Sequence, residues 1–108
     1  MADNALIKAK DIINTHDVVV FSKTTCPYCK MTKQRLRDQE KLNPYVIELN
    51  EIDDGPDIQA ALKKAYNQGT VPNIFIKGNH IGGNSDLTAT TSEKIQQLLS
   101  AEDDKERL

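Results

Sequence analysis

The stretch Val18-Val19-Val20-Phe21-Ser22-Lys23-Thr24-Thr25-Cys26-Pro27-Tyr28-Cys29 decides how this chain folds. Its first four residues are an unbroken β-branched and aromatic run, which is typical of a central strand buried on both faces. From Met31 to Gln39 the residues are good helix formers without Gly or Pro, and they predict a helix. The two cysteines therefore lie between a buried strand and the helix that follows it.

Two further elements are predicted on either side of this unit. Apolar residues spaced three and four apart from Ala5 to Ile13 predict a first helix, capped by Asp3 or Asn4 and ending near His16. The apolar and β-branched segment Tyr45–Leu49 predicts a second strand. The strand before the cysteines and this second strand would form a right-handed β-α-β unit with parallel strands.

The second half of the chain predicts a helix and a hairpin. Apolar residues share one helical face from Ile58 to Tyr66, and Pro56 or Asp57 suits the opening turn of that helix. The segment Asn73–Ile81 predicts two short antiparallel strands that are joined by Gly78-Asn79. With the hairpin added, the predicted fold is α/β: one mixed four-stranded sheet with helices on both faces.

One last helix is predicted after the hairpin, capped by Ser85 or Asp86. Its apolar residues are Leu87, Ile95, Leu98 and Leu99. We expect one domain over residues 1–108, because a chain of this length forms one hydrophobic core. Residues 101–108 are mostly charged and are expected to be a frayed end.

Composition excludes several classes of protein. The 108 residues hold 14 Lys+Arg and 16 Asp+Glu, with 38% hydrophobic residues, which is unlike a disordered chain or a strongly basic nucleic-acid-binding one. The sequence has no apolar run long enough to span a membrane and no secretory signal at its start, so a cytoplasmic protein is expected. In that reducing compartment, two cysteines are expected to be catalytic, redox-sensing or metal-binding.

The position of the cysteine pair predicts redox chemistry. The amides and dipole at a helix N-terminus stabilise an anion, so Cys26 is expected to be a thiolate, helped by the flanking Lys23 and Lys30. Cys29, one turn further on, should lie deeper and be less ionised. We therefore predict that Cys26 attacks and that Cys29 resolves the mixed disulfide.

Two other interpretations of the pair are weaker. A zinc site needs four ligands, and the other candidates are His16 and His80, which are distant in sequence, so no metal is expected. A structural disulfide between residues three apart closes a loop too short to constrain the unfolded chain.

Charge around the cysteines indicates the type of substrate. Residues 22–41 contain six basic and two acidic residues, and a basic collar beside a thiolate suits an anionic thiol substrate. Taken one at a time, Lys33, Arg35 and Arg37 also fit an ordinary solvated helix face.

The residues match a known family over about Ala5 to Leu99. The chain resembles a dithiol glutaredoxin in Cys26-Pro-Tyr-Cys29, Thr70-Val71-Pro72 and Gly82–Leu87, which occur in the family's order. It contains no Trp, unlike the Trp-Cys-Gly-Pro-Cys of thioredoxins. The resemblance implies a thioredoxin-like fold and a binding site for glutathione.

That resemblance implies a role for each site residue. A cis Pro72 would place Val71 against the cysteinyl unit, Lys23 and Gln59 would meet the glycyl carboxylate, and residues 84–86 would hold the γ-glutamyl group. Asp86 and Ser85 could also be helix caps alone. The implied glutathione site comprises Lys23, Tyr28, Gln59, Thr70, Val71, Pro72, Gly83, Asn84, Ser85 and Asp86.

One position departs from the family pattern. Many members have Arg directly before Thr-Val-Pro, whereas this chain has Gly69 there. A cationic contact to the glycyl carboxylate is therefore missing, so affinity for glutathione is expected to be lower or to depend more on Lys23 and Gln59.

The implied activity is glutathione-dependent reduction of glutathione–protein mixed disulfides and of protein disulfides. Expected partners are glutathione, glutathionylated or disulfide-containing proteins and, indirectly, glutathione reductase with NADPH. A monomer is expected, with no tightly bound cofactor and with no nucleic acid or membrane as partner. The alternative is a dimer that bridges a [2Fe-2S] cluster through Cys26 of each chain and two glutathione thiolates, although Pro27 disfavours it.

Overall fold

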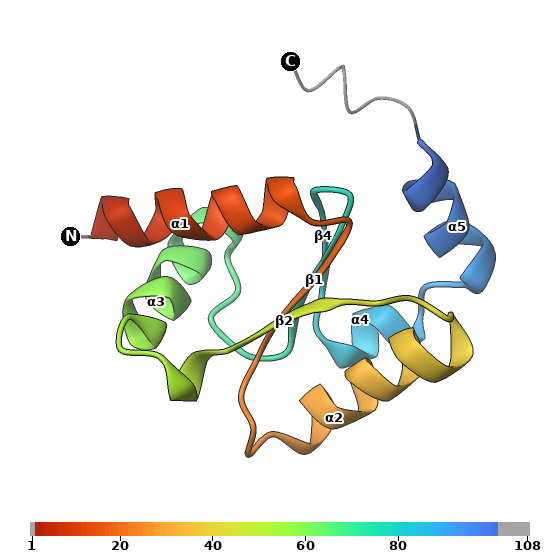
Figure 1. Cartoon of the computed structure of the whole chain (residues 1–108), viewed down its shortest axis with the longest axis horizontal. Coiled ribbons are helices and arrows are strands. Elements are labelled where there is room, and N and C mark those ends of the chain that lie inside the picture. The colour runs from red at the N-terminus through yellow and green to blue at the C-terminus, as the bar shows by residue number, and fades with distance from the viewer. Residues whose placement is uncertain (1, 102–108) are drawn as a thin grey trace.

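The computed structural model describes residues 2–101, whose elements follow one another along the chain as shown in Figure 1. The elements are α1 (Ala2–Thr15), β1 (Val18–Ser22), α2 (Pro27–Gln34), the π-helical turn η1 (Arg35–Gln39), β2 (Tyr45–Glu48), the 3₁₀ turn η2 (Leu49–Glu51), α3 (Gly55–Tyr66), β3 (Asn73–Ile76), β4 (Asn79–Gly82), α4 (Asn84–Thr88) and α5 (Ser92–Ser100).

The strands form one mixed four-stranded sheet in the order β2-β1-β3-β4, which confirms the predicted fold class. Strand β1 is parallel to β2 and antiparallel to β3, and β4 is antiparallel to β3. All five residues of β1 are buried, as its uninterrupted apolar run predicts. The loop that carries Cys26 therefore leaves the centre of the sheet.

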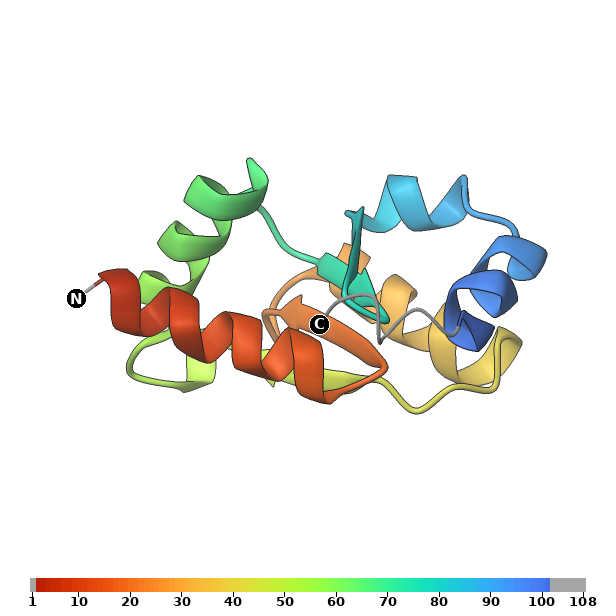
Figure 2. The same ribbon diagram turned by 90° about the horizontal axis from the view of Figure 1, so that it is seen from above.

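Helices cover both faces of the sheet (Figure 2). Val19, Phe21 and Phe75 belong to the hydrophobic cluster that contains the buried residues of α1 and α3. Val18 and Val20 point the other way, into a second cluster with Leu36, Leu87 and Ile95 from η1, α4 and α5. Alternation along the strand thus divides the core into two halves.

The helix after the cysteines differs from the prediction. It begins at Pro27, because Cys26 caps it and proline is tolerated in the first helical turn. After Gln34 the chain widens into the π-helical turn Arg35–Gln39. Helix-forming propensity does not distinguish these two kinds of turn, so the change has no sequence signal.

The predicted last helix is two helices. Residues 89–91 separate α4 from α5, and the Thr91 hydroxyl accepts a hydrogen bond from the backbone N–H of Lys94 at 3.0 Å. Thr91 is therefore a second N-cap within the segment predicted as one helix. The gap between Leu87 and Ile95 in the apolar pattern marks this break.

Two smaller boundaries also move. The hairpin turn is Lys77-Gly78 rather than Gly78-Asn79: both turn residues have positive φ angles, 51° and 80°, and Asn79 begins β4. Helix α1 includes Asp3 and Asn4, so neither caps it. Helix α3 begins at Gly55, so Pro56 and Asp57 both lie in its opening turn, as expected.

Helix α5 ends at Ser100, and the predicted frayed segment lies outside the described residues from position 102 onward. Within residues 2–101, none of the helices has the length and apolar character that crossing a membrane requires.

Candidate active site

Cys26 occupies the N-cap of α2. Its backbone is extended, with φ −99° and ψ 115°, and its Sγ accepts a hydrogen bond from the backbone N–H of Cys29 at 3.3 Å. An N-cap sulfur receives both this hydrogen bond and the positive end of the helix dipole, and each stabilises a thiolate. The strand-to-helix junction read from the sequence therefore provides the environment of a nucleophile.

Cys29 lies in a different environment although it is one turn away. Cys29 is a fully buried residue of α2, whereas Cys26 is partly exposed, and both are free thiols. Burial raises the pKa of the Cys29 thiol, and its hydrogen bond with Cys26 raises that pKa further. The prediction that the second cysteine lies deeper is confirmed, and the raised pKa of Cys29 agrees with a thiol that keeps its proton.

The loop that precedes β3 lies beside Cys26. The Val71–Pro72 peptide bond is cis, as the resemblance implied, and the carbonyl oxygen of Val71 lies 3.7 Å from Cys26 Sγ. The Gln68 side chain braces this loop, because its Nε2 donates to the carbonyl of Pro72 at 3.1 Å. The backbone carbonyl of Val71 is thus held beside the nucleophilic sulfur.

A groove of about 360 Å³ runs beside this loop. It brings together seven of the ten residues of the expected glutathione site, and Tyr28, 61% exposed, lies at the cysteine end of the set. The lining residues are Tyr28, Thr70, Val71, Pro72, Gly83, Asn84 and Ser85.

The start of α4 forms part of this groove. The backbone N–H of Gly83 donates to Asp86 Oδ2 at 2.9 Å, so Asp86 caps its own helix. Gly82 has a φ of 118°, and an added Cβ there would collide with the Asp86 carboxylate. The chain can therefore turn tightly into α4 only with glycine at position 82.

Three expected residues do not line the groove. Lys23 is partly exposed in the loop before Cys26, and Asp86 is occupied by its capping hydrogen bond. The Gln59 side chain is engaged in a hydrogen bond within the protein, because its Nε2 donates to the carbonyl of Gly69 at 2.6 Å. Its role here is to brace the loop before Thr70, which short-range sequence patterns do not show.

The basic collar is partly neutralised. Lys33 Nζ lies 2.9 Å from a carboxylate oxygen of Glu48, and Arg35 is paired with Glu40, so neither belongs to a freely solvated face. Arg37 is exposed, as that interpretation expected. Glu48 is distant in sequence from Lys33, and Glu40 follows Arg35 across a π-helical turn. The usual three- and four-residue spacing of helical ion pairs therefore does not predict either partner.

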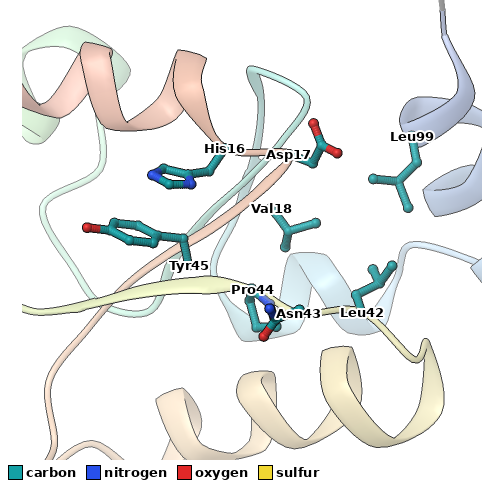
Figure 3. A pocket seen from close by; sticks show the side chains of 8 residues that line it. All are labelled: His16, Asp17, Val18, Leu42, Asn43, Pro44, Tyr45 and Leu99. Carbon is teal, nitrogen blue, oxygen red and sulfur yellow. The ribbon is translucent and has the colours of Figure 1, made fainter.

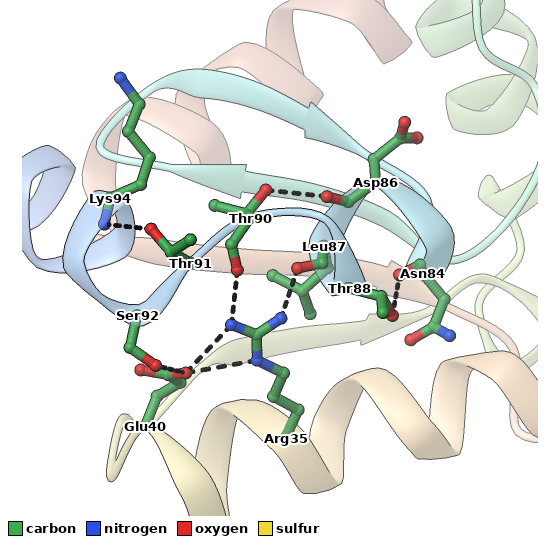
Figure 4. Close-up of polar contacts among 10 residues, drawn as sticks. All are labelled: Arg35, Glu40, Asn84, Asp86, Leu87, Thr88, Thr90, Thr91, Ser92 and Lys94. Carbon is green, nitrogen blue, oxygen red and sulfur yellow. Dashed lines mark hydrogen bonds and ion pairs between the residues drawn. The ribbon is translucent and has the colours of Figure 1, made fainter.

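Two other residues near the groove were not predicted. Thr32 is fully buried and its hydroxyl donates to Asn84 Oδ1 at 2.8 Å. The Arg35 guanidinium reaches the segment between α4 and α5 (Figure 4). The sequence offers only a weak sign of these two roles, namely that a polar residue stands at a position where the helix faces the core.

A second hollow, of about 350 Å³, lies at the opposite end of β1 (Figure 3). The rings of His16 and Tyr45 stack there with centroids 3.8 Å apart, and Leu99 faces them from α5. Neither cysteine lines this hollow, whereas the groove is lined by Val71, whose carbonyl oxygen lies 3.7 Å from Cys26 Sγ, and by Tyr28 between the two cysteines. The chemistry therefore belongs to the groove.

Comparison with known proteins agrees with this geometry. A family model described as glutaredoxin matches residues 18–81. Glutaredoxin-C4 of Arabidopsis thaliana is 43% identical over 98 residues, which cover 90% of this chain and 72% of the relative. Glutaredoxin-1 of Saccharomyces cerevisiae is 47% identical over 99 residues, covering 84% of this chain and 90% of the relative.

Solved structures show the same fold. A buckwheat glutaredoxin–glutathione complex has a TM-score of 0.85 and 42% identity, covering 92% of this chain and 90% of that one. The holo form of glutaredoxin C1 from Populus tremula x tremuloides has a TM-score of 0.84 and 43% identity, covering 90% and 96%. The expected thioredoxin-like fold is confirmed, and the chain belongs to the glutaredoxin family of thiol–disulfide oxidoreductases.

Proposed function

We propose that this protein uses glutathione to reduce glutathione–protein mixed disulfides and protein disulfides, with Cys26 as the nucleophile. The observation that carries the proposal is the juxtaposition of an N-cap sulfur with a groove lined by seven residues of the expected tripeptide site. The similarity to a buckwheat glutaredoxin that was solved as a complex with glutathione supports this tripeptide as the ligand.

The loop at Val71, the start of α4 and Lys23 would each hold one part of the tripeptide. The backbone of Val71, beside the cis Pro72, offers strand-like hydrogen bonds to the cysteinyl unit. At the start of α4, Asn84 and Ser85 line the groove and offer polar groups to the γ-glutamyl end. Lys23 is proposed to approach the glycyl carboxylate, because it is a partly exposed cation close to Cys26.

In the monothiol route, the Cys26 thiolate attacks the glutathionyl sulfur of a mixed disulfide. The old S–S bond breaks, the substrate leaves as a thiolate that takes up a proton, and a Cys26–glutathione disulfide forms. The thiolate of a second glutathione attacks the glutathione sulfur of that disulfide. Glutathione disulfide departs, made of the substrate's glutathionyl group and the one glutathione that entered, and Cys26 is again a thiolate.

Protein disulfides would use both cysteines. Cys26 forms a mixed disulfide with the substrate, and Cys29, deprotonated as it attacks, displaces the substrate and closes a Cys26–Cys29 disulfide. Two glutathiones then reduce this bridge. The raised pKa of Cys29 suits a thiol that stays protonated until its partner is bonded.

This mechanism needs glutathione as co-substrate, reduced again by glutathione reductase and NADPH, and no tightly bound cofactor. We propose that the protein works as a cytoplasmic monomer on glutathionylated or disulfide-containing proteins, without nucleic acid or membrane as partner. An open groove beside a partly exposed sulfur is accessible without a second subunit.

In the cluster-bridging alternative, the Cys26 sulfur would be an iron ligand instead of a nucleophile. Cys26 is accessible and Cys29 is buried, so one chain offers a single thiolate, and three ligands must come from a second copy and free thiols. The absorbance spectrum of anaerobically purified protein separates the two functions. A brown protein with thiolate–iron bands would favour the cluster.

The proposal is tested by the steady-state deglutathionylation of a model peptide, coupled to glutathione reductase and NADPH. Wild type and Cys29→Ser are both expected to turn over, whereas Cys26→Ser is expected to be inactive. If wild type is folded but inactive, the groove does not serve glutathione and the proposal is wrong.

A further inference from the structure

Helix α4 is too short to hold itself in place. It has five residues, Asn84–Thr88, of which Leu87 is buried, while its first residues line the groove beside Cys26. One helical turn has little stability of its own, because nucleation is unfavourable and few hydrogen bonds form. Contacts from outside α4 must therefore determine where Asn84 and Ser85 lie.

The first of these contacts joins α2 to the start of α4. Thr32 is fully buried, and its hydroxyl donates to Asn84 Oδ1 at 2.8 Å. Since the amide oxygen is occupied in this way, the Asn84 NH₂ group is the end that remains to face a ligand. Thr32 therefore sets the orientation of a side chain that lines the groove.

The second contact binds the other end of α4. Arg35 donates from Nη1 to the carbonyl of Leu87 and from Nη2 to the carbonyl of Thr90, the latter at 2.7 Å (Figure 4). Leu87 lies in the last turn of α4 and Thr90 lies just beyond it, and the Leu87 carbonyl also accepts a hydrogen bond from the backbone N–H of Thr90 at 2.9 Å. The planar guanidinium joins the two carbonyls in one rigid fork, which a lysine cannot reproduce.

The carboxylate of Glu40 holds the Arg35 guanidinium in place. Its Oε2 lies 3.1 Å from Arg35 Nη2 and 3.3 Å from Nε, and it accepts a hydrogen bond from the Ser92 hydroxyl at 2.7 Å. The side chain of Glu40 is 3% exposed and that of Arg35 is 16% exposed, so solvent screens this pair weakly. The beginning of α5 is tied to the same carboxylate.

We propose that Thr32 and Arg35 are positioning residues, which hold the start of α4 at the correct distance from Cys26 for the glutathionyl group to bind. Thr32 lies on the helix that Cys26 caps, and Arg35 begins the π-helical turn that follows it. The sulfur and the far end of the groove thus share one rigid support. This inference rests on the proposed function, because it assigns a role within the same site.

The test is the steady-state kinetics of Thr32→Val and Arg35→Lys with a glutathionylated peptide. Thr32→Val keeps the shape and loses the hydrogen bond, and Arg35→Lys keeps the charge and loses the fork. Each is expected to raise KM about fivefold, the usual effect of one lost hydrogen bond, and to change kcat less than twofold. Thr32→Ser should restore the wild-type KM.

Two matched variants serve as controls. Thr15→Val removes a hydroxyl that bonds within α1, and Arg37→Lys changes an exposed arginine of the same π-helical turn. Both should keep the wild-type KM. The rate at which iodoacetamide alkylates Cys26 should be the same in every variant, since the positioning residues act on the groove and not on the sulfur.

The outcomes separate the two proposals. Active wild type with an unchanged KM in Thr32→Val and Arg35→Lys would overturn the positioning role alone. A KM that rises equally in Thr32→Ser, or in the controls, would also overturn it, because general loosening would then explain the effect. Inactive wild type would overturn the proposed function, and the positioning role with it. Should Arg35→Lys fail to fold, the Thr32 pair decides.

Discussion

Both faces of the sheet bury an apolar cluster, but the face that carries the site also has directional hydrogen bonds between its helices. On one face, α1 and α3 pack through apolar residues such as Ala9, Ile13 and Leu62, which are almost completely buried. On the other face, the short α4 is tied to α2 and η1 by the directional bonds of Thr32 and Arg35. Burial of apolar area stabilises the fold without regard to direction, whereas hydrogen bonds fix positions.

This difference shows how a small protein separates stability from function. The face with continuous apolar packing can tolerate a shift of a few tenths of an ångström, but a site that binds a tripeptide beside a sulfur cannot. The structure therefore predicts that changes on the two faces have different consequences: lost stability on the first and lost activity or affinity on the second.

The largest expected effect is on the site face. Cys26→Ser should lower deglutathionylation at least about a thousandfold, because a hydroxyl replaces the thiolate nucleophile. The free energy of unfolding should change by less than about 0.5 kcal/mol, since Cys26 is partly exposed. Urea unfolding beside the coupled assay measures both, and a large stability loss would contradict the division between the faces.

Leu62→Ala tests the opposite face. Leu62 is 1% exposed within the α1–α3 cluster, so its truncation should lower the free energy of unfolding by about 2–5 kcal/mol. The exposed Lys64→Ala on the same helix is the control and should stay within about 0.5 kcal/mol. At a temperature where Leu62→Ala is folded, its KM should equal that of wild type, and an altered KM would show that the faces are coupled.

The two cysteines provide a test within the site face. Because burial raises the pKa of Cys29, its alkylation in Cys26→Ser should require a higher pH than that of an ordinary thiol. The folded state then holds this proton more tightly than the unfolded chain, so stability should fall as pH rises above the ordinary thiol pKa. Mass spectrometry of iodoacetamide-treated protein against pH measures the reactivity, and equal reactivity with an unfolded control would count against the burial.

Gly69→Arg is expected to have the smallest effect. A side chain there first meets Lys63, whose Cδ lies 2.8 Å from the added Cβ and can move aside. The new cation should lower KM for the glutathionylated peptide about twofold, with the gain shrinking at high salt. Gly69→Gln, which has similar reach without charge, is the control. An equal change in both would show that charge is not the cause.

Much of the fold was predictable because local patterns carry it. The unbroken Val18–Phe21 run predicted a buried central strand, and the position of Cys26 between strand and helix predicted a cysteine at a helix N-terminus. The break between α4 and α5 was missed because helix formers and Thr residues meet there without Gly or Pro. That break depends on the Thr91 cap and on the Arg35 fork, which joins residues 52 and 55 positions apart.

The site was predicted less completely than the fold. The resemblance named the loop at Val71 and the start of α4, and the groove contains both. It named Gln59 as a ligand residue, whereas the structure turns that amide to Gly69. Such a hydrogen bond depends on how α3 packs against the loop, and neither composition nor spacing reports it.

The central claim is that glutathione bound to Cys26 occupies the groove between the Val71 loop and the start of α4. Amide NMR spectra of Cys29→Ser, before and after formation of the Cys26–glutathione disulfide, test it most directly. The account predicts the largest shifts at residues 70–71 and 83–86, with small shifts in α1 and at the His16–Tyr45 hollow. Shifts that spare residues 83–86, or that centre on the hollow, would contradict it.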